Sequence, residues 1–274
     1  MRIDKFLADM GEGTRSQVKT IIRNKRVAVN GGIITKAEYA VGEGDEVTLD
    51  GRKICYRKYE YYMLNKPAGV VSATTDKDCK TVVDFIDSKR RETLFPVGRL
   101  DKDTVGLLVI TNDGKMAHNL LSPAKHINKT YYAKVDGIVT DEHVMIFSKG
   151  IEMHDGTIFK PSVLEIVTSG EISEVLITIT EGKFHQIKRM FCAIGMNVIY
   201  LKRISMGNLE LDVNLKEGEY RELTEKEIDK LCCSGYEEYF KNRTVSDIME
   251  EYSEQHDEWE MINCPDQDAE GKEK

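Results

Sequence analysis

The chain has 274 residues, of which 41% are apolar and 31% are charged, so it is long enough to bury one large core or two smaller ones. No apolar run approaches the roughly 18 residues of a membrane-spanning helix, and no apolar signal core follows the first residues. Six scattered cysteines without a C-x-x-C pair indicate neither a zinc site nor a disulfide framework. We therefore expect a cytoplasmic protein with reduced thiols, and neither a membrane protein nor a secreted scaffold.

The net charge of −8 is distributed unevenly along the chain. Residues 234–274 contain 13 acidic and 4 basic side chains, whereas the other 233 residues contain 34 acidic and 35 basic ones. The acidic total therefore does not exclude nucleic-acid binding by the first 233 residues. The acidic tail has few aliphatic residues, and we expect it to be mobile or loosely helical.

Residues 1–26 have the pattern of two helices. Apolar residues recur at helical spacing from Ile3 to Met10, and they predict the first helix. Thr14 and Gln17 form the pattern of a capping box, which predicts the start of the second helix. The side of the second helix that we expect to be buried consists of Val18, Ile21 and Ile22.

The following segment has the pattern of β structure. Residues 27–34 place two β-prone pairs around Asn30-Gly31, which predicts a hairpin, and residues 45–49 predict one more strand. Residues 49–60 are polar and lack a clear period, so we interpret them as a flexible linker that lets the first unit move.

Strand and helix patterns alternate from residue 61 to residue 233. A helix is expected over 184–194, and Thr224 with Glu227 predicts the cap of a last short helix. The expected strands are 61–65, 107–111, 130–135, 162–167, 174–180 and 197–201. Separated strands with few helices indicate an α+β fold with a mixed sheet rather than repeated β-α-β units. We divide the chain into residues 1–48, a linker at 49–60, a second domain at 61–233 and an acidic tail at 234–274.

The exposed side of the second helix is basic. Its cations follow one another at spacings of four, four and three residues, and they are Arg15, Lys19, Arg23 and Arg26. Four cations on one face form a phosphate-binding surface, although a solvated helix face is the alternative interpretation.

An aspartate, Asp101, lies in a glycine-bounded loop before the apolar strand at 107–111. Loops beside rigid strands often carry reactive groups, and nearby cations such as Arg99 and Lys102 favour an ionised carboxylate. An ionised carboxylate can act as a nucleophile or a base. A surface turn with an incidental charge is the alternative.

The first 48 residues resemble the S4 RNA-binding domain. The matching pieces are the stretch from Arg2 to Ala8, Arg15-Ser16, and the segment from Val27 to Gly31. The resemblance implies that the two helices and the hairpin bind structured RNA. The implied RNA contacts are Lys5, Arg15, Ser16, Lys19, Arg23 and Arg26.

The second domain resembles pseudouridine synthases. Gly98-Arg99-Leu100-Asp101, followed by Thr104-x-Gly106-Leu107-Leu108, is similar to the signature loop of the branch that acts on small-subunit and large-subunit ribosomal RNA. Three further motifs follow the order of this family, and they are Asn65-Lys66-Pro67-Ala68-Gly69-Val70, Lys129-Thr130-Tyr131 and the stretch from Glu181 to Met190. The resemblance implies a mainly antiparallel synthase domain that isomerises uridine to pseudouridine without a cofactor or a metal.

This resemblance also implies roles for particular residues. Asp101 matches the essential aspartate, Tyr131 the active-site tyrosine, and Lys188 the basic residue that pairs with the aspartate. Whether Asp101 attacks the sugar or removes a ribose proton stays open. The further residues that the resemblance places near the RNA are Arg99, Lys129, His185, Gln186 and Arg189.

The sequence from His185 to Met190 is more similar to the family members that act on small-subunit ribosomal RNA than to those that act on large-subunit ribosomal RNA. We therefore expect a monomeric enzyme that acts on 16S ribosomal RNA, free or within a partly assembled small ribosomal subunit. A large-subunit (23S) enzyme and a catalytically silent RNA-binding assembly factor are the two alternatives.

Overall fold

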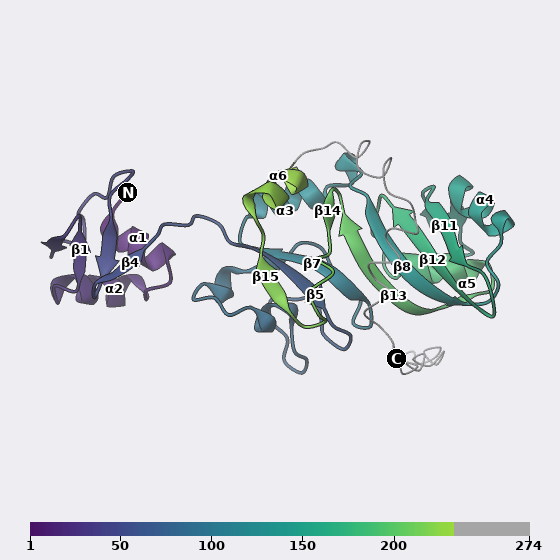
Figure 1. Cartoon of the computed structure of the whole chain (residues 1–274), viewed down its shortest axis with the longest axis horizontal. Coiled ribbons are helices and arrows are strands. Elements are labelled where there is room, and N and C mark those ends of the chain that lie inside the picture. The colour runs from purple at the N-terminus through teal and green to yellow at the C-terminus, as the bar shows by residue number, and fades with distance from the viewer. Residues whose placement is uncertain (233–274) are drawn as a thin grey trace, which may run out of the picture.

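The computed structural model describes residues 1–232, which form a small unit, an extended connection and a larger unit (Figure 1). Both units combine helices with mainly antiparallel sheet, so the predicted α+β class is confirmed. The predicted acidic tail at 234–274 lies outside the described residues.

The small unit packs two helices against a four-stranded sheet with the strand order β2-β1-β3-β4. Its helices are α1 (Ile3–Asp9) and α2 (Arg15–Arg23). Its strands are β1 (Val27–Val29), β2 (Gly32–Ile34), β3 (Val47–Leu49) and β4 (Arg52–Ile54). One apolar core joins the helices to the sheet, so the cationic side of α2 is left in solvent.

The start of α2 has the predicted capping box. The amide of Gln17 donates to the Thr14 hydroxyl (3.3 Å), and the Gln17 side chain accepts from the amide of Thr14 (2.8 Å). Val18 and Ile22 are fully buried on the inner side of the helix. The predicted hairpin is also confirmed, with Asn30 and Gly31 in the left-handed conformation that a tight two-residue turn requires.

The predicted linker at 49–60 is wrong in part, because β4 lies inside it. Asp50 and Gly51 adopt positive φ angles of 49° and 78° and turn the chain, so that β4 pairs with β3. A strand of three residues is too short to display a period, which is why the sequence pattern did not reveal it. The connection outside the sheets is therefore limited to residues 55–60.

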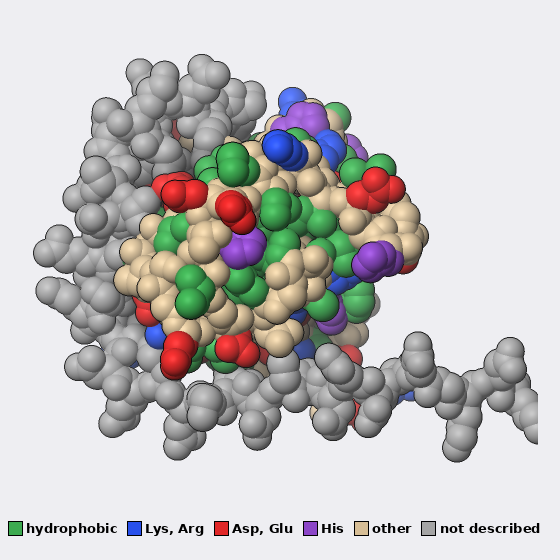
Figure 2. All heavy atoms as spheres, turned by 90° about the vertical axis from the view of Figure 1, so that its right-hand side faces the viewer, with side chains coloured by type: hydrophobic (Ala, Val, Ile, Leu, Met, Phe, Trp, Pro, Cys, Tyr) green, Lys and Arg blue, Asp and Glu red, His purple; other side chains and the backbone are tan. Residues whose placement is uncertain are grey.

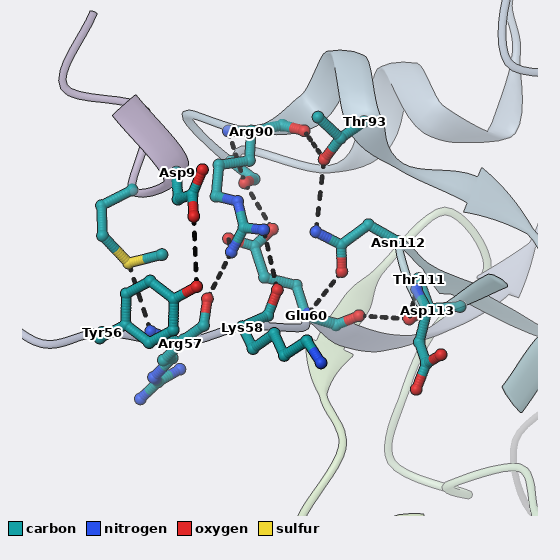
Figure 3. Close-up of polar contacts among 12 residues, drawn as sticks. Asp9, Tyr56, Arg57, Lys58, Glu60, Arg90, Thr93, Thr111, Asn112 and Asp113 are labelled. Carbon is teal, nitrogen blue, oxygen red and sulfur yellow. Dashed lines mark hydrogen bonds and ion pairs between the residues drawn. The ribbon is translucent and has the colours of Figure 1, made fainter. Parts of the chain in front are cut away.

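Hydrogen bonds tie this connection to both units (Figure 3). The Tyr56 hydroxyl donates to Asp9 of α1 (3.2 Å). The guanidinium of Arg90, from the larger unit, donates to the carbonyls of Arg57 (2.6 Å) and Lys58 (3.0 Å). The segment that was predicted to be flexible is thus bonded along most of its length.

A second contact joins the units directly. The carboxylate of Glu12, only 8% exposed, lies 2.8 Å from Arg52 of β4 and 2.8 Å from Lys89 of the larger unit. Burial alone raises the pKa of Glu12, but the hydrogen bonds from the two cations outweigh it and leave the pKa below its ordinary value.

The larger unit contains a nine-stranded sheet with the order β11-β12-β8-β13-β7-β5-β15, to which β6 and β14 add at β7 and β13. Its strands are β5 (Tyr61–Lys66), β6 (Phe95–Pro96), β7 (Val105–Thr111), β8 (Lys129–Asp136), β11 (Val163–Thr168), β12 (Ile172–Ile179), β13 (Asn197–Met206), β14 (Leu209–Glu210) and β15 (Tyr220–Glu222). A separate hairpin consists of β9 (Ile151–Glu152) and β10 (Ile158–Phe159). Among the described strands, β7 and β13 form the one parallel pair of the large sheet.

Helices cover both faces of this sheet. The α-helices are α3 (Gly114–Leu121), α4 (Asp141–Lys149), α5 (Gln186–Ala193) and α6 (Glu225–Cys232). Three short 3-10 helices are η1 (Val82–Phe85), η2 (Arg91–Thr93) and η3 (Pro123–Lys125). Successive residues of β7 point to opposite faces of the sheet. Leu108 packs in the core beneath α4 and α5, and Leu107 packs in the core beneath α3 and α6.

The parallel contact between β7 and β13 depends on a glycine. Gly106 has a φ of +99°, and a Cβ at this position would lie 2.3 Å from the backbone oxygen of Arg203. Only glycine permits this approach, so the loop before β7 is held against β13.

Figure 2 shows the end of the large unit that α4 and its neighbouring strands form. Hydrophobic side chains spread across this face, with acidic ones around them. Ile138, Met145 and Ile172 are each more than half exposed there.

Candidate active site

Asp101 lies in the loop between β6 and β7, and hydrogen bonds fix the backbone of this loop. The Ser72 hydroxyl donates to the carbonyl of Leu100 (2.8 Å) and accepts from its amide (3.0 Å). The amide of Gly69 donates to the carbonyl of Lys102 (2.8 Å). The loop is therefore held by Gly69, which belongs to the motif Asn65–Val70, and by Ser72, which follows that motif.

The buried side chain of Lys66 fixes the same loop from below. Its ammonium group donates to the carbonyls of Lys102 (3.2 Å) and Thr104 (2.8 Å). Burial lowers the pKa of Lys66 to about 8, although the negative charges of Asp103 and Asp101 favour the protonated form.

Two basic side chains approach the carboxylate of Asp101. The Nζ atom of Lys188 lies 3.7 Å from one carboxylate oxygen, and Nε2 of His185 lies 3.7 Å from the other. Both residues belong to the start of α5, where His185 is the N-cap and has a φ of 48°. This left-handed residue ends the turn before the helix, so α5 begins at Gln186 rather than at the predicted residue 184.

Lys188 is closer to Asp103 than to Asp101. Its Nζ atom lies 2.5 and 2.6 Å from the two carboxylate oxygens of Asp103. Burial alone raises the pKa of Asp103, but the hydrogen bond and the charge of Lys188 outweigh it and leave the pKa below its ordinary value. The predicted Asp101–Lys188 pair is thus part of a three-membered cluster. Asp103 was not predicted as a site residue, and its signal in the sequence is its place two residues after Asp101.

Tyr131 lies on β8 and is only 7% exposed. Its neighbours in the sheet are Ile177 of β12 and Arg203 of β13. Asp101, Tyr131 and Lys188 line a single cavity, so the structure brings the three predicted catalytic residues together. A carboxylate, an aromatic ring and an ammonium group in one cavity can supply a nucleophile or base, a stacking surface and a counter-charge.

Four of the predicted RNA contacts lie in or beside this cavity, and they are Arg99, Lys129, His185 and Gln186. Arg99 and His185 line it, and Arg99 is exposed. The ring of His185 stacks on Phe184, which is 75% exposed, with 3.8 Å between the ring centroids. Lys129 lines an adjoining cavity on the other side of Tyr131.

Two predicted RNA contacts on α5, Gln186 and Arg189, are engaged within the protein. Gln186 is buried, accepts from the amide of Lys183 (3.0 Å) and donates to Glu181 (3.0 Å). Arg189 lies 2.6 Å from Asp155. These positions differ from the predicted contacts, because helical spacing does not reveal which side chains the neighbouring turns bind.

The predicted RNA contacts of the small unit divide into two sets. Lys5 forms an ion pair with Asp9 (2.6 Å), and Arg26 forms one with Asp50 (2.5 Å). The others are exposed and have no ion pair within residues 1–232, and they are Arg15, Ser16, Lys19 and Arg23. The basic surface of α2 is therefore open to a ligand.

Within the described part of the chain, no group of three or more His, Cys, Asp and Glu side chains is arranged to hold a metal ion. No described helix is both long and apolar enough to cross a membrane. The described cysteines Cys55, Cys79 and Cys192 are unpaired.

Known proteins with similar sequences identify the family. Residues 60–193 match the family described as RNA pseudouridylate synthase, and residues 1–47 match the S4 domain. The uncharacterised RNA pseudouridine synthase YtzG of Bacillus subtilis is 44% identical over 234 residues, which cover 84% of this chain and 98% of that protein. The ribosomal small subunit pseudouridine synthase A of Escherichia coli is 40% identical over 230 residues, or 83% of this chain and 98% of that protein.

A solved structure agrees with this result. The crystal structure of a pseudouridylate synthase superimposes with a TM-score of 0.60 at 37% identity, and the match covers 84% of this chain and 99% of the other. The chain therefore belongs to the RNA pseudouridine synthase family, with an S4 domain followed by the synthase domain. It is an RNA pseudouridine synthase, as the sequence motifs predicted.

Proposed function

We propose that this enzyme converts one specific uridine of 16S ribosomal RNA to pseudouridine, with Asp101 as the reacting carboxylate. The observation that carries the proposal is the cavity that Asp101, Tyr131 and Lys188 line together. The name and the 40% identity of the Escherichia coli ribosomal small subunit synthase, matched over 98% of its length, support the small-subunit target.

The reaction breaks the bond between N1 of the base and C1′ of the ribose and forms a bond between C5 and C1′. The proton that leaves C5 is balanced by the one that N1 gains, so no oxidant or reductant is consumed. Asp101 either attacks C1′ as N1 departs and is displaced by C5, or removes a ribose proton. Both routes require the carboxylate in its ionised form.

Tyr131 and Lys188 have supporting roles in this proposal. The ring of Tyr131 lies in the wall of the cavity, where an extruded uracil base can stack on it. The tyrosine hydroxyl assists the removal of the C5 proton. Lys188, whose Nζ atom lies 3.7 Å from Asp101, orients the carboxylate as its counter-charge.

The S4 domain anchors the RNA in this proposal. The exposed cations Arg15, Lys19 and Arg23 bind phosphates of a structured region while the target uridine enters the cavity. We further propose that a monomer acts in the cytoplasm, on free 16S ribosomal RNA or on a partly assembled small subunit.

The proposal is tested by mapping pseudouridines in ribosomal RNA with carbodiimide-based primer extension. The cells to compare lack the gene or carry the wild type, Asp101→Asn or the control Asp87→Asn. Asp87 is an exposed carboxylate in a loop outside the cavity. We expect one stop in 16S RNA to vanish without the gene and with Asp101→Asn, and to persist with Asp87→Asn.

Other results would replace this proposal with one of its alternatives. Loss of a stop in 23S RNA would keep the chemistry and contradict the small-subunit target. If no stop changes while Asp101→Asn restores growth and subunit assembly, the chain would act as an RNA-binding assembly factor.

A further inference from the structure

A second cavity adjoins the one that contains Asp101. Both cavities share Arg99, Tyr131, Gly182 and Lys183 in their walls. The second cavity is lined in addition by the partly buried Lys129 at the start of β8 and by Arg203 of β13. Its charged side chains are Arg99, Lys129, Lys160, Glu181, Lys183 and Arg203.

The charges of this second cavity are unbalanced. Five cationic side chains face one carboxylate, that of Glu181, and this carboxylate is already engaged. It accepts from the amide of Lys160 (2.9 Å) and the side chain of Gln186 (3.0 Å), and it lies 3.4 Å from Lys183. Among the described residues, no ion pair joins Arg99, Lys129 or Arg203 to a carboxylate.

Arg203 is the most buried of these cations. Its side chain is 2% exposed, and its Nε atom donates to the carbonyl of Leu107 (2.8 Å). Its Nη2 atom is buried and has no hydrogen-bond partner among residues 1–232. A buried guanidinium with an unused donor is costly unless an anion completes its surroundings.

Lys129 is in a similar position. Its ammonium group donates to the carbonyl of Ile127 (2.9 Å), and no carboxylate among residues 1–232 forms an ion pair with it. Burial, followed by the positive charge of Arg203, lowers the pKa of Lys129 to about 8. The two cations therefore destabilise one another until a negative charge enters the cavity.

We propose that this cavity binds one phosphate group of the RNA backbone beside the target uridine, through Lys129, Arg203 and Arg99. An arginine fork with a free donor matches the oxygens of a phosphate, and a lysine adds a point charge. A nucleotide whose base lies against Tyr131 carries its phosphates next to that ring, where the second cavity begins. This inference rests on the proposed function.

Lys129→Met is the informative variant, because it removes the charge and keeps most of the side-chain volume. Arg203 is less suitable, because its replacement would also remove its hydrogen bond to the Leu107 carbonyl and could disturb the fold. The matched control is Lys134→Met, a lysine on the same strand but on its opposite face, paired with Glu174 at 3.5 Å.

Binding of a 16S RNA transcript is measured by filter retention over a series of potassium chloride concentrations. All proteins carry Asp101→Asn, which prevents turnover. We expect Lys129→Met to weaken binding about tenfold and to reduce the slope of log affinity against log salt by about 0.7 to 0.9. We expect Lys134→Met to change neither quantity, and equal effects of the two variants would overturn the proposal.

The pH dependence provides a readout that a structural role would not move. The groups that face Lys129 are Arg203 of β13, Arg99 of the loop before β7, Tyr131, and Lys160, Glu181 and Lys183 from the segments after β10 and β12. With a free pKa of about 8, affinity should fall about fourfold between about pH 7 and about pH 8.5, and this fall should vanish in Lys129→Met. An unchanged pH profile in the variant would contradict the proposal.

Inorganic phosphate distinguishes a backbone phosphate from a free one. If free phosphate stabilises the protein against heat through Lys129 while Lys129→Met leaves RNA affinity intact, the site serves a small anion and the proposal fails. Turnover of the wild type on the same transcript is measured first. If the wild type forms pseudouridine but Lys129→Met does not change RNA affinity, this inference alone is rejected. If the wild type forms no pseudouridine in any ribosomal RNA, the proposed function is rejected.

Discussion

The cations of α2 and those around Asp101 differ in what holds them. Arg15, Lys19 and Arg23 lie exposed on α2 without an ion pair among the described residues. Lys188 is bonded to Asp103 and lies 3.7 Å from Asp101, with 24% of its side chain exposed. Free cations supply salt-dependent affinity, whereas held cations fix the geometry of a neighbouring group. Regular spacing along a helix is common to both and does not distinguish them.

The largest effect is expected from Lys188→Met. Without the ammonium group, Asp101 and Asp103 lose the cation that they share, so the reacting carboxylate loses part of its orientation. We expect kcat to fall about 1000-fold and the dissociation constant for RNA to change less than about threefold. Single-turnover kinetics with a 16S transcript measures both quantities, and a loss confined to binding would place Lys188 with the cations of α2.

Asp103→Asn tests the other side of the same cluster. The amide keeps an acceptor for Lys188 but removes the charge that binds it at 2.5 Å. We expect a loss of about tenfold in kcat, smaller than that of Lys188→Met, because the ammonium group can then turn fully to Asp101. An equal loss in both variants would mean that Asp103 is as necessary to the reaction as the lysine.

Neutralising the exposed cations of α2 should act on RNA binding rather than on kcat, with an effect larger than that of Asp103→Asn. The triple variant Arg15→Gln, Lys19→Gln and Arg23→Gln is expected to weaken RNA binding about 100-fold, with a salt slope lower by about 2 and an unchanged kcat. The control is Lys5→Gln with Arg26→Gln, since both cations are already paired with carboxylates. A control that weakens binding as strongly would refute the distinction between free and held cations.

Arg90 concerns the connection between the two regions. Its side chain holds the carbonyls of Arg57 and Lys58, so Arg90→Gln should release the connection. We expect a loss of about 1 to 2 kcal/mol in unfolding free energy and a wider distribution of distances between spin labels on the two units. Arg91→Gln, an exposed neighbour, is the control, and identical distance distributions would show that other contacts fix the units.

The smallest effect is expected from Glu227→Gln, which removes the ion pair with Arg221 and changes the stability of the fold. The hydrogen bond from Arg221 lowers the pKa of Glu227 to about 2, so the pair stabilises the fold above the ordinary pKa and loses this effect as pH falls toward 2. Glu227→Gln should cost about 1 kcal/mol near neutral pH and nothing at about pH 2. Chemical denaturation against pH measures this difference, with the exposed Glu225→Gln as the control.

Elements with a repeated apolar pattern or a turn motif were predictable from the sequence, and elements without either were missed. The strands around 61–65, 107–111 and 130–135 were found because several apolar residues alternate or run together. The strand β4 and the helices α3 and α4 were missed, since three residues show no period and helices on a sheet carry a narrow apolar side. The predicted end of the strand at 201 was also too early, because β13 continues to Met206.

The site was predictable where a motif marks it. Asp101, Tyr131 and Lys188 were expected together and do line one cavity. Asp103 was not expected, because its importance comes from its contact with Lys188, which lies far from it in the sequence. For Arg203, a single sequence does not show which groups a buried strand arginine contacts.

The parallel contact between β7 and β13 has a consequence for the time at which activity arises. It joins Val105 and Gly106 to Lys202 and Arg203, and thus brings the loop of Asp101 against strands made much later in the chain. A nascent chain that ends before α5 and β13 contains Asp101 but lacks Lys188 and Leu201, which line the same cavity. The S4 domain is complete long before that point, so newly made chains acquire an RNA-binding surface before they acquire a catalyst.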